Sequence, residues 1–272
     1  MCGIVAYSGQ REAEPILLEG LRRLEYRGYD SAGVATLTGS TLCVRKTAGR
    51  VADLAKLLAK HPAPGTSGIS HTRWATHGGA TDANAHPHLG GEQIVAVVHN
   101  GVIENYTHLK KQLEEDGFVF HSETDTEVIA HLIALHLKDD LVDAVRHALP
   151  FLKGSYALAV VSPRFPGVIV GARLGSPLVV GLGAGEFFLA SDPNALIGYT
   201  ERVVFMQDRQ LCVLRPDGWE LMTLDRESAG AEVHQLDWDP GDADKGDHEH
   251  YMLKEIYEQP EGIERAMAGR LD

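Results

Sequence analysis

The chain has 272 residues, with 25 Lys plus Arg, 38 Asp plus Glu and a formal net charge of −13. Hydrophobic residues make up 44% and charged residues 23%, which excludes a mostly disordered chain and allows a large core. The acidic balance argues against a nucleic-acid partner, and no apolar run reaches the roughly 18 residues of a membrane span. The three cysteines have no paired spacing, so we expect a cytoplasmic protein without a disulfide framework.

Hydrophobic periodicity and turn residues predict a mixture of strands and helices. A helical stripe of leucines follows Pro15, which is tolerated in the first turn of a helix. The run Ile94–Val98 is too apolar for an edge strand, so we expect it to be covered on both faces. In chain order we expect a strand at 2–8, a helix at 14–24, strands at 31–37 and 41–46, a helix at 51–60, a strand at 94–98, helices at about 104–116, 125–137 and 139–149, and strands at 156–161, 168–172, 178–181, 186–190, 203–206, 210–214 and 219–224.

The grouping of these elements predicts a layered α+β fold. Helices cluster in the middle of the chain and strands follow Pro150, which argues against a strictly alternating βαβ sheet. The helix expected at 125–137 opens with a capping-box pattern, in which Glu127 follows Thr124 by three residues.

Residues 225–250 differ from the rest of the chain. They carry nine acidic and two basic residues, and therefore −7 of the net charge, without apolar periodicity. A structureless segment of this length is unusual inside a compact domain, so we interpret it as a linker. Residues 251–271 have a helical pattern again, with a break expected at Pro260, and we expect them to begin a domain that this chain does not complete.

Cys2 offers the clearest chemistry in the sequence. Removal of Met1 would leave a thiol and a free α-amine on one residue. The pKa of an α-amine is about 7.7–8.0, so the amine can accept the thiol proton near neutral pH. A nucleophile paired with an N-terminal amine is a known catalytic arrangement, although position alone does not distinguish it from an incidental thiol.

Three further segments carry polar and aromatic residues where strands end. Residues 21–33 concentrate charges and aromatics in a turn, residues 71–78 form a loop that ends in glycine, and His99-Asn100-Gly101 follows the most apolar strand. Together with Cys2 they resemble the class II glutamine amidotransferases, which belong to the N-terminal-nucleophile hydrolases. Within that family, Leu-Glu-Tyr-Arg-Gly-Tyr-Asp-Ser-Ala-Gly and His-Thr-Arg-Trp-Ala-Thr-His-Gly are similar to segments of the glutamine:fructose-6-phosphate amidotransferases (glucosamine-6-phosphate synthases). The similarity extends to residues 84–88, 122–127, 191–192 and 251–260.

The resemblance implies a four-layer αββα sandwich of the N-terminal-nucleophile hydrolase type. It implies a glutaminase domain over residues 1–224, an acidic linker over 225–250 and the start of a missing sugar-isomerase domain over 251–272. The implied reaction is hydrolysis of L-glutamine to glutamate and ammonia through a Cys2 thioester, as the ammonia-supplying half of glucosamine 6-phosphate synthesis from fructose 6-phosphate. No cofactor or metal is expected, and the full-length enzyme is expected to be a homo-oligomer.

The resemblance also implies roles for individual residues. Cys2 is the nucleophile, and the Asn100 side-chain amide and the Gly101 backbone N–H stabilise the oxyanion. The planar Arg73 guanidinium holds the α-carboxylate of glutamine, and the Asp125 carboxylate holds the α-ammonium group.

The resemblance implies that Thr76, His77 and Gly101 also bind the substrate, and it implies supporting roles for Arg27 and Trp74. Thr76 and His77 line the pocket, Arg27 orders the site near Cys2, and Trp74 gates the route by which ammonia leaves. Simpler interpretations exist: Trp74 alone suits a core aromatic, and an arginine in such a loop suits a surface ion pair.

Other simple interpretations and rival functions stay open at this point. Asp125 at the start of a helix is favoured by the helix dipole, and Asn100-Gly101 is a common turn pair. Cys43 and Cys212 are expected to be buried and inert. The histidine pairs at 86/88 and 248/250 lack the further ligands of a metal site. The alternatives are a glutaminase domain of another class II amidotransferase, such as the purine-pathway phosphoribosyl enzyme, and a non-catalytic docking domain.

Overall fold

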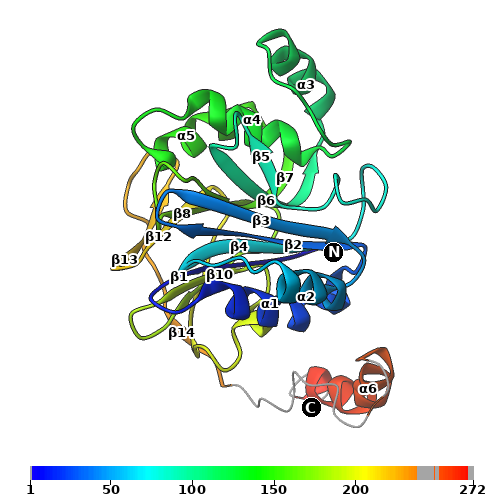
Figure 1. The fold of residues 1–272 in the computed structure, drawn as a ribbon. Helices are drawn as coiled ribbons and strands as arrows, with labels where there is room; N and C mark the ends of the chain where they lie inside the picture. Colours follow the sequence, from blue (N-terminus) through cyan, green and yellow to red (C-terminus); the bar gives the residue numbers. More distant parts are fainter. Residues whose placement is uncertain (1, 238–247, 249–250, 269–272) are drawn as a thin grey trace. The chain divides into compact units, whose positions relative to one another are not determined.

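The computed structural model describes residues 2–237, 248 and 251–268. They divide into two compact units, Met1–Leu236 and Asp237–Asp272. In the first unit, strands pair antiparallel in an eight-stranded sheet ordered β14-β11-β9-β10-β1-β4-β2-β3 and a six-stranded sheet ordered β13-β12-β8-β7-β6-β5 (Figure 1). The strands of the larger sheet are β1 (Gly3–Ser8), β2 (Ser31–Thr38), β3 (Thr41–Ala48), β4 (Ser67–Arg73), β9 (Val179–Leu182), β10 (Phe187–Ala190), β11 (Arg202–Phe205) and β14 (His234–Gln235). Those of the smaller sheet are β5 (His88–Gly90), β6 (Val95–Ile103), β7 (Gly154–Val161), β8 (Ile169–Leu174), β12 (Gln210–Arg215) and β13 (Gly218–Thr223).

Helices cover the outer face of each sheet. Two of them, α1 (Ala13–Arg23) and α2 (Val51–Lys60), pack against the larger sheet, and α3 (Tyr106–Glu115), α4 (Thr126–His136) and α5 (Leu141–Ala148) lie on the side of the smaller one (Figure 1). Short 3₁₀ turns lie at η1 (Glu25–Arg27), η2 (Leu149–Phe151) and η3 (Pro193–Leu196).

Buried apolar residues form three clusters, one between each pair of adjacent layers. One lies between α1, α2 and the larger sheet, one between the two sheets, and one between the smaller sheet and its helices. Alternate residues of β6 belong to two of these clusters. Val95 and Val97 face the helices, whereas Ala96 and Val98 face the other sheet. The four-layer αββα sandwich and the two-sided burial of this strand are therefore confirmed.

Local details differ from the expectation at two places near the middle of the chain. The strand β6 continues to Ile103, so His99-Asn100-Gly101 lies within the strand and not after it. The capping box expected between Thr124 and Glu127 does not form. Instead, the Glu127 carboxylate accepts hydrogen bonds from the backbone N–H groups of His121 and Ser122, which bind it more strongly than a single cap can.

The C-terminal region also departs from the expected pattern. The first unit extends to Leu236, past the boundary at 224, because β14 pairs with β11 and Arg226 forms an ion pair of 2.7 Å with Asp140. Much of the expected linker, residues 238–247 and 249–250, lies outside the described residues, as do Met1 and residues 269–272. In the second unit, α6 (Tyr251–Met267) runs through Pro260, so the expected break there is wrong. A proline removes one backbone donor, and this exposed helix tolerates that loss.

Candidate active site

A cavity of about 290 Å³ opens where strands of both sheets end. The antiparallel register of β1 and β4 pairs Gly3 with Thr72, so Cys2 and Arg73 lie side by side at this edge. From the smaller sheet, β6 contributes Asn100 and Gly101. The cavity is lined by Cys2, Arg27, Arg73, Trp74, Thr76, His86, His99, Asn100, Gly101, Val102, Thr124, Asp125, Thr126, Ser176 and Pro177. Of the nine site residues expected from the sequence, only His77 is missing from this lining.

The Cys2 thiol is held by the loop that follows β4. Its Sγ accepts a hydrogen bond of 3.1 Å from the Trp74 backbone N–H. Burial raises the pKa of the Cys2 thiol, and the Trp74 N–H and the nearby Arg73 cation offset part of that effect. The thiol is therefore mostly protonated near neutral pH and requires a base before it can act as a nucleophile.

Asn100 and Gly101 line the same cavity as Cys2 for different structural reasons. The Asn100 Nδ2 group donates to the Cys2 backbone carbonyl at 3.0 Å, while its Oδ1 accepts from His71 Nε2 at 2.9 Å. Gly101 has φ +134°, and a Cβ there would lie 2.1 Å from the carbonyl oxygen of Ser155 on β7. Only glycine fits this position without moving one strand away from the other.

Arg73 is almost fully buried and organises its own loop. Its guanidinium donates to the His77 carbonyl and, at 3.1 Å, to the Gly79 carbonyl. A guanidinium carries five N–H donors, so donors remain for a carboxylate in the cavity.

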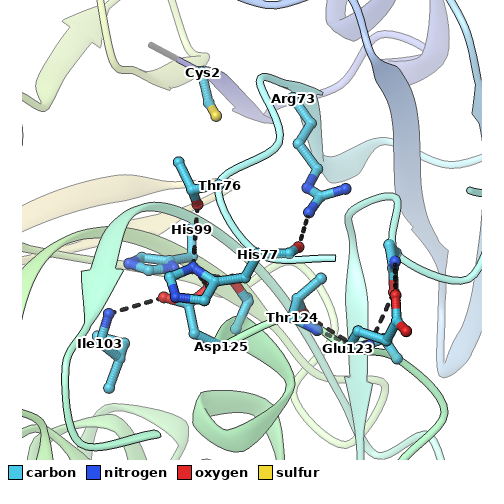
Figure 2. Close-up of polar contacts among 12 residues, drawn as sticks. Cys2, Arg73, Thr76, His77, His99, Ile103, Glu123, Thr124 and Asp125 are labelled. Carbon is cyan, nitrogen blue, oxygen red and sulfur yellow. Dashed lines mark hydrogen bonds and ion pairs between the residues drawn. The ribbon is translucent and has the colours of Figure 1, made fainter. Parts of the chain in front are cut away.

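Figure 2 shows the Cys2 sulfur pointing toward the side on which Thr76 lies. The Thr76 hydroxyl is 3.3 Å from the Nδ1 atom of His77.

Asp125 precedes α4 and is also buried. Its Oδ2 accepts a hydrogen bond of 2.8 Å from the Ile103 backbone N–H, which joins the end of β6 to the start of α4 (Figure 2). Its Oδ1 lies 3.9 Å from His77 Nδ1. The helix dipole alone does not explain this residue, because the carboxylate caps no N–H of its own helix and lines the cavity instead.

Arg27 and Trp74 complete the cavity at opposite extremes of exposure. The buried Arg27 forms an ion pair of 2.6 Å with Asp192, which also accepts a hydrogen bond from Tyr26. Trp74 is 47% exposed and packs edge-on against Tyr29, with ring centroids 5.5 Å apart. It is therefore a rim residue and not a core aromatic.

Buried histidines around the cavity are the part of the site that the sequence analysis missed. His71 and His86 stack with ring centroids 4.1 Å apart. Burial lowers the pKa of His71 to about 3 and also lowers the pKa of His86 and His99. His99 uses both ring nitrogens, on the Thr126 hydroxyl at 2.9 Å and the Ser155 carbonyl at 3.4 Å. Among the described residues the Cys2 sulfur forms its hydrogen bonds with the Trp74 backbone and not with these imidazoles, and no three His, Cys, Asp or Glu side chains there could hold a metal.

A partly buried lysine holds the loop that carries His86. The Lys46 ammonium donates to three backbone carbonyls of this loop, and burial lowers its pKa to about 8. These carbonyls belong to Ala83 (3.1 Å), Ala85 (2.7 Å) and Pro87 (3.3 Å).

Comparison with known proteins adds sequence relatives to this geometry. Residues 71–198 match a family model described as "Glutamine amidotransferase domain". A protein of Symbiobacterium thermophilum named glutamine–fructose-6-phosphate aminotransferase (isomerizing) is 53% identical over 272 residues, and one of the same name from Thermus thermophilus is 51% identical over 271. Each match covers 100% of this chain and 45% of the relative, so the chain spans less than half the length of these curated relatives.

Solved structures share the fold. Glutamine phosphoribosylpyrophosphate amidotransferase from B. subtilis, complexed with ADP and GMP, superposes with a TM-score of 0.72 at 28% identity, covering 84% of this chain and 50% of that one. A glutamine aminotransferase class-II domain protein from Silicibacter pomeroyi gives a TM-score of 0.57 at 19% identity, over 82% of this chain and 99% of that one, which supports the fold alone. The sequence matches to the curated relatives include every segment that builds the cavity.

Proposed function

Because the chain belongs to the class II glutamine amidotransferases, we propose that its cavity binds L-glutamine and that Cys2 attacks the side-chain amide. One observation carries this proposal. Cys2, Arg73, Asn100 and Asp125 come from four separate segments and line a single cavity of about 290 Å³. That volume suits a small amino acid, and the four side chains supply a nucleophile, a cation, an amide donor and an anion.

Recognition of glutamine uses the two buried charges. The Arg73 guanidinium binds the α-carboxylate, for which its planar arrangement of donors is the right shape. The Asp125 carboxylate binds the α-ammonium group. Thr76 lines the cavity beside the bound amino acid, and His77 contributes through its contact with Asp125 and its carbonyl on Arg73. A zwitterion with a short amide side chain satisfies all of these groups together.

The α-amine of Cys2 is the general base in this proposal. Burial lowers the pKa of His71, His86 and His99, so these imidazoles are weaker bases than an α-amine, whose pKa is about 7.7–8.0 and which can accept the thiol proton. Attack then gives a tetrahedral oxyanion that the Asn100 amide and the Gly101 N–H stabilise, followed by a thioester, ammonia and hydrolysis to glutamate. Arg27 orders the site around Cys2, and Trp74 at the rim covers the exit of ammonia.

The complete reaction involves more than this chain. By analogy with the relatives that bear that name, we propose that the ammonia serves the amination of fructose 6-phosphate in an isomerase domain that follows. The acidic linker of this proposal then begins after Leu236, where the first unit ends, and residues 251–272 begin that domain, in a cytoplasmic homo-oligomer. The three cysteines are free thiols, which fits a reducing compartment. In the described part of the chain no helix has the length and apolar character of a membrane span.

Mass spectrometry and an ammonia assay test the proposal on this chain. Intact mass establishes whether Met1 has been removed, and ammonia release from L-glutamine is then compared for wild type, Cys2→Ala and Cys43→Ala. We expect Cys2→Ala to abolish release and Cys43→Ala to preserve it, because Cys43 does not line the cavity. Activity that survives Cys2→Ala in a chain beginning at residue 2 would overturn the mechanism. A wild-type chain that begins at Cys2 and releases no ammonia would favour the docking-domain alternative.

A further inference from the structure

The Asn100 amide is held from its far side by a histidine that does not reach the cavity. His71 is fully buried on β4, and its Nε2 lies 2.9 Å from Asn100 Oδ1, across the interface between the two sheets. We infer that His71 is a positioning residue, which fixes the orientation of the Asn100 amide so that its NH₂ group faces Cys2. The inference rests on the proposed function, in which Asn100 is an oxyanion donor.

The position of the proton on His71 follows from its surroundings. Its Nε2 lies 3.1 Å from the backbone carbonyl of His99, which can only accept a hydrogen bond. The imidazole is neutral, because burial lowers its pKa to about 3, so it carries a single N–H. That N–H is therefore on Nε2, independently of how the Asn100 amide is oriented.

The orientation of the Asn100 amide is then determined from both ends. A protonated Nε2 on His71 cannot accept a hydrogen bond, so the amide atom 2.9 Å from it must be an acceptor, and Oδ1 is the only acceptor of the amide. At the other end, the Cys2 carbonyl requires a donor, and Nδ2 lies 3.0 Å from it. The flipped amide would set two donors against each other at His71 and two oxygens against each other at Cys2.

This arrangement prepares the oxyanion donor before glutamine binds. One N–H of the Asn100 amide is used by the Cys2 carbonyl, and the second is available toward the cavity that Asn100 lines. Without His71, the buried Oδ1 loses its partner and the side chain rotates to find another donor. His71 is distant enough from the ligand space that its loss should act on kcat more than on KM, since it is absent from the cavity lining.

Steady-state glutaminase kinetics on this chain test the inference. The variants are His71→Leu, His71→Gln, Asn100→Ala and the double variant His71→Leu/Asn100→Ala. Loss of one oxyanion donor lowers kcat by about 10²–10³-fold, which sets the upper limit for an effect of His71. We expect His71→Leu to lower kcat roughly tenfold to a hundredfold with KM within about threefold, and His71→Gln, which can offer an N–H near the position of Nε2, to recover most of the loss.

The double variant separates positioning from a general structural role. If His71 acts through the amide, His71→Leu changes kcat less than about twofold in the Asn100→Ala background, because nothing remains to be oriented. If His71→Leu lowers kcat by the same factor in the wild-type and in the Asn100→Ala background, the inference is overturned. If His71→Leu does not fold, His71→Gln is compared with the shorter His71→Asn. Similar kcat values for these two would then count against it.

The same measurements distinguish this inference from the proposed function. Full activity of Cys2→Ala or Asn100→Ala contradicts the proposed chemistry itself. Inactive Cys2→Ala and weakened Asn100→Ala, together with an additive effect of His71→Leu, contradict only the positioning role.

Discussion

Glu127 links the first turn of α4 to the segment that leads into the active site. Its carboxylate is 3% exposed and accepts hydrogen bonds from the backbone N–H groups of His121 and Ser122, at 2.8 and 2.7 Å, and from the Ser122 hydroxyl at 2.6 Å. His131 lies 3.6 Å away through Nε2, and its Nδ1 accepts from the Gly91 N–H, so the proton on this ring faces Glu127. We predict that Glu127→Gln strongly destabilises the fold at neutral pH.

The magnitude follows from the carboxylate's pKa. Burial alone would raise the pKa of Glu127, but the contacts with His131, Ser122 and the backbone of His121 outweigh burial and lower it from 4.5 to about 2. Each pKa unit corresponds to about 1.4 kcal/mol, so the ionised carboxylate contributes about 3 kcal/mol to folding at pH 7. A lowered acid pKa makes this contribution complete above about pH 4.5, and it is lost as the pH falls toward 2.

Equilibrium urea unfolding at pH 7 and at lower pH measures this effect. At pH 7 we expect Glu127→Gln to lower the free energy of unfolding by about 3 kcal/mol, and the difference from wild type to shrink steadily below pH 4.5. Glu114→Gln on the exposed face of α3 is the control and should stay within about 0.5 kcal/mol of wild type. A loss below 1 kcal/mol at pH 7, or a loss independent of pH, would refute the reasoning.

Three further predictions concern the loop lysine, the strand glycine and the substrate carboxylate. The lowered pKa of Lys46 means that the folded chain releases this proton before the unfolded chain does, so stability should rise by up to about 3 kcal/mol between pH 8 and 10.5. Urea unfolding should show that Lys46→Met removes this rise and that the exposed Lys56→Met retains it. Gly101→Ala should abolish ammonia release and lower the melting temperature, because its Cβ meets the opposite strand, whereas Gly218→Ala, whose Cβ meets nothing within 4 Å, should be neutral. Asp125→Asn should raise the glutamine KM by about tenfold or more through loss of the ammonium partner, and an unchanged KM would remove this residue from the binding site.

The residues that line the cavity were expected mainly from the family resemblance, because only Cys2 carries a chemical signal of its own. Cys2 is marked by its position beside the initiator methionine, whereas Arg73 alone suits a surface ion pair, Asn100 a turn and Asp125 the start of a helix. Their family resemblance then joined segments that no local pattern could connect. The element boundaries were reliable where turn residues mark them, as at Gly39, which separates the strands expected at 31–37 and 41–46 and lies where β2 and β3 meet.

The histidines were missed for a physical reason. His71 and His99 belong to strands of different sheets, and they matter only because β4 and β6 face each other across the inter-sheet core. The spacing of residues along the sequence does not indicate that these two strands lie face to face. The end of β6 was misjudged for a similar reason, because the polar residues Asn100 and Gly101 remain paired with β7 and take part in the site without leaving the sheet.

The geometry of the proposed site therefore depends on how the two sheets are spaced. Cys2 precedes a strand of the larger sheet, whereas Asn100 lies in the smaller one, and a single hydrogen bond of 3.0 Å joins them. Ala96 and Ala157 contribute small side chains to the core between the sheets, and Ala157 on β7 is paired with Asn100. Close approach of the sheets lets a β4 histidine reach a β6 amide and lets that amide reach the Cys2 carbonyl. The same packing that excludes water from the core thus sets the distance between Cys2 and Asn100, for which we propose the roles of nucleophile and oxyanion donor, so the precision of the proposed site is a property of the sandwich and not of the loop after β4 alone.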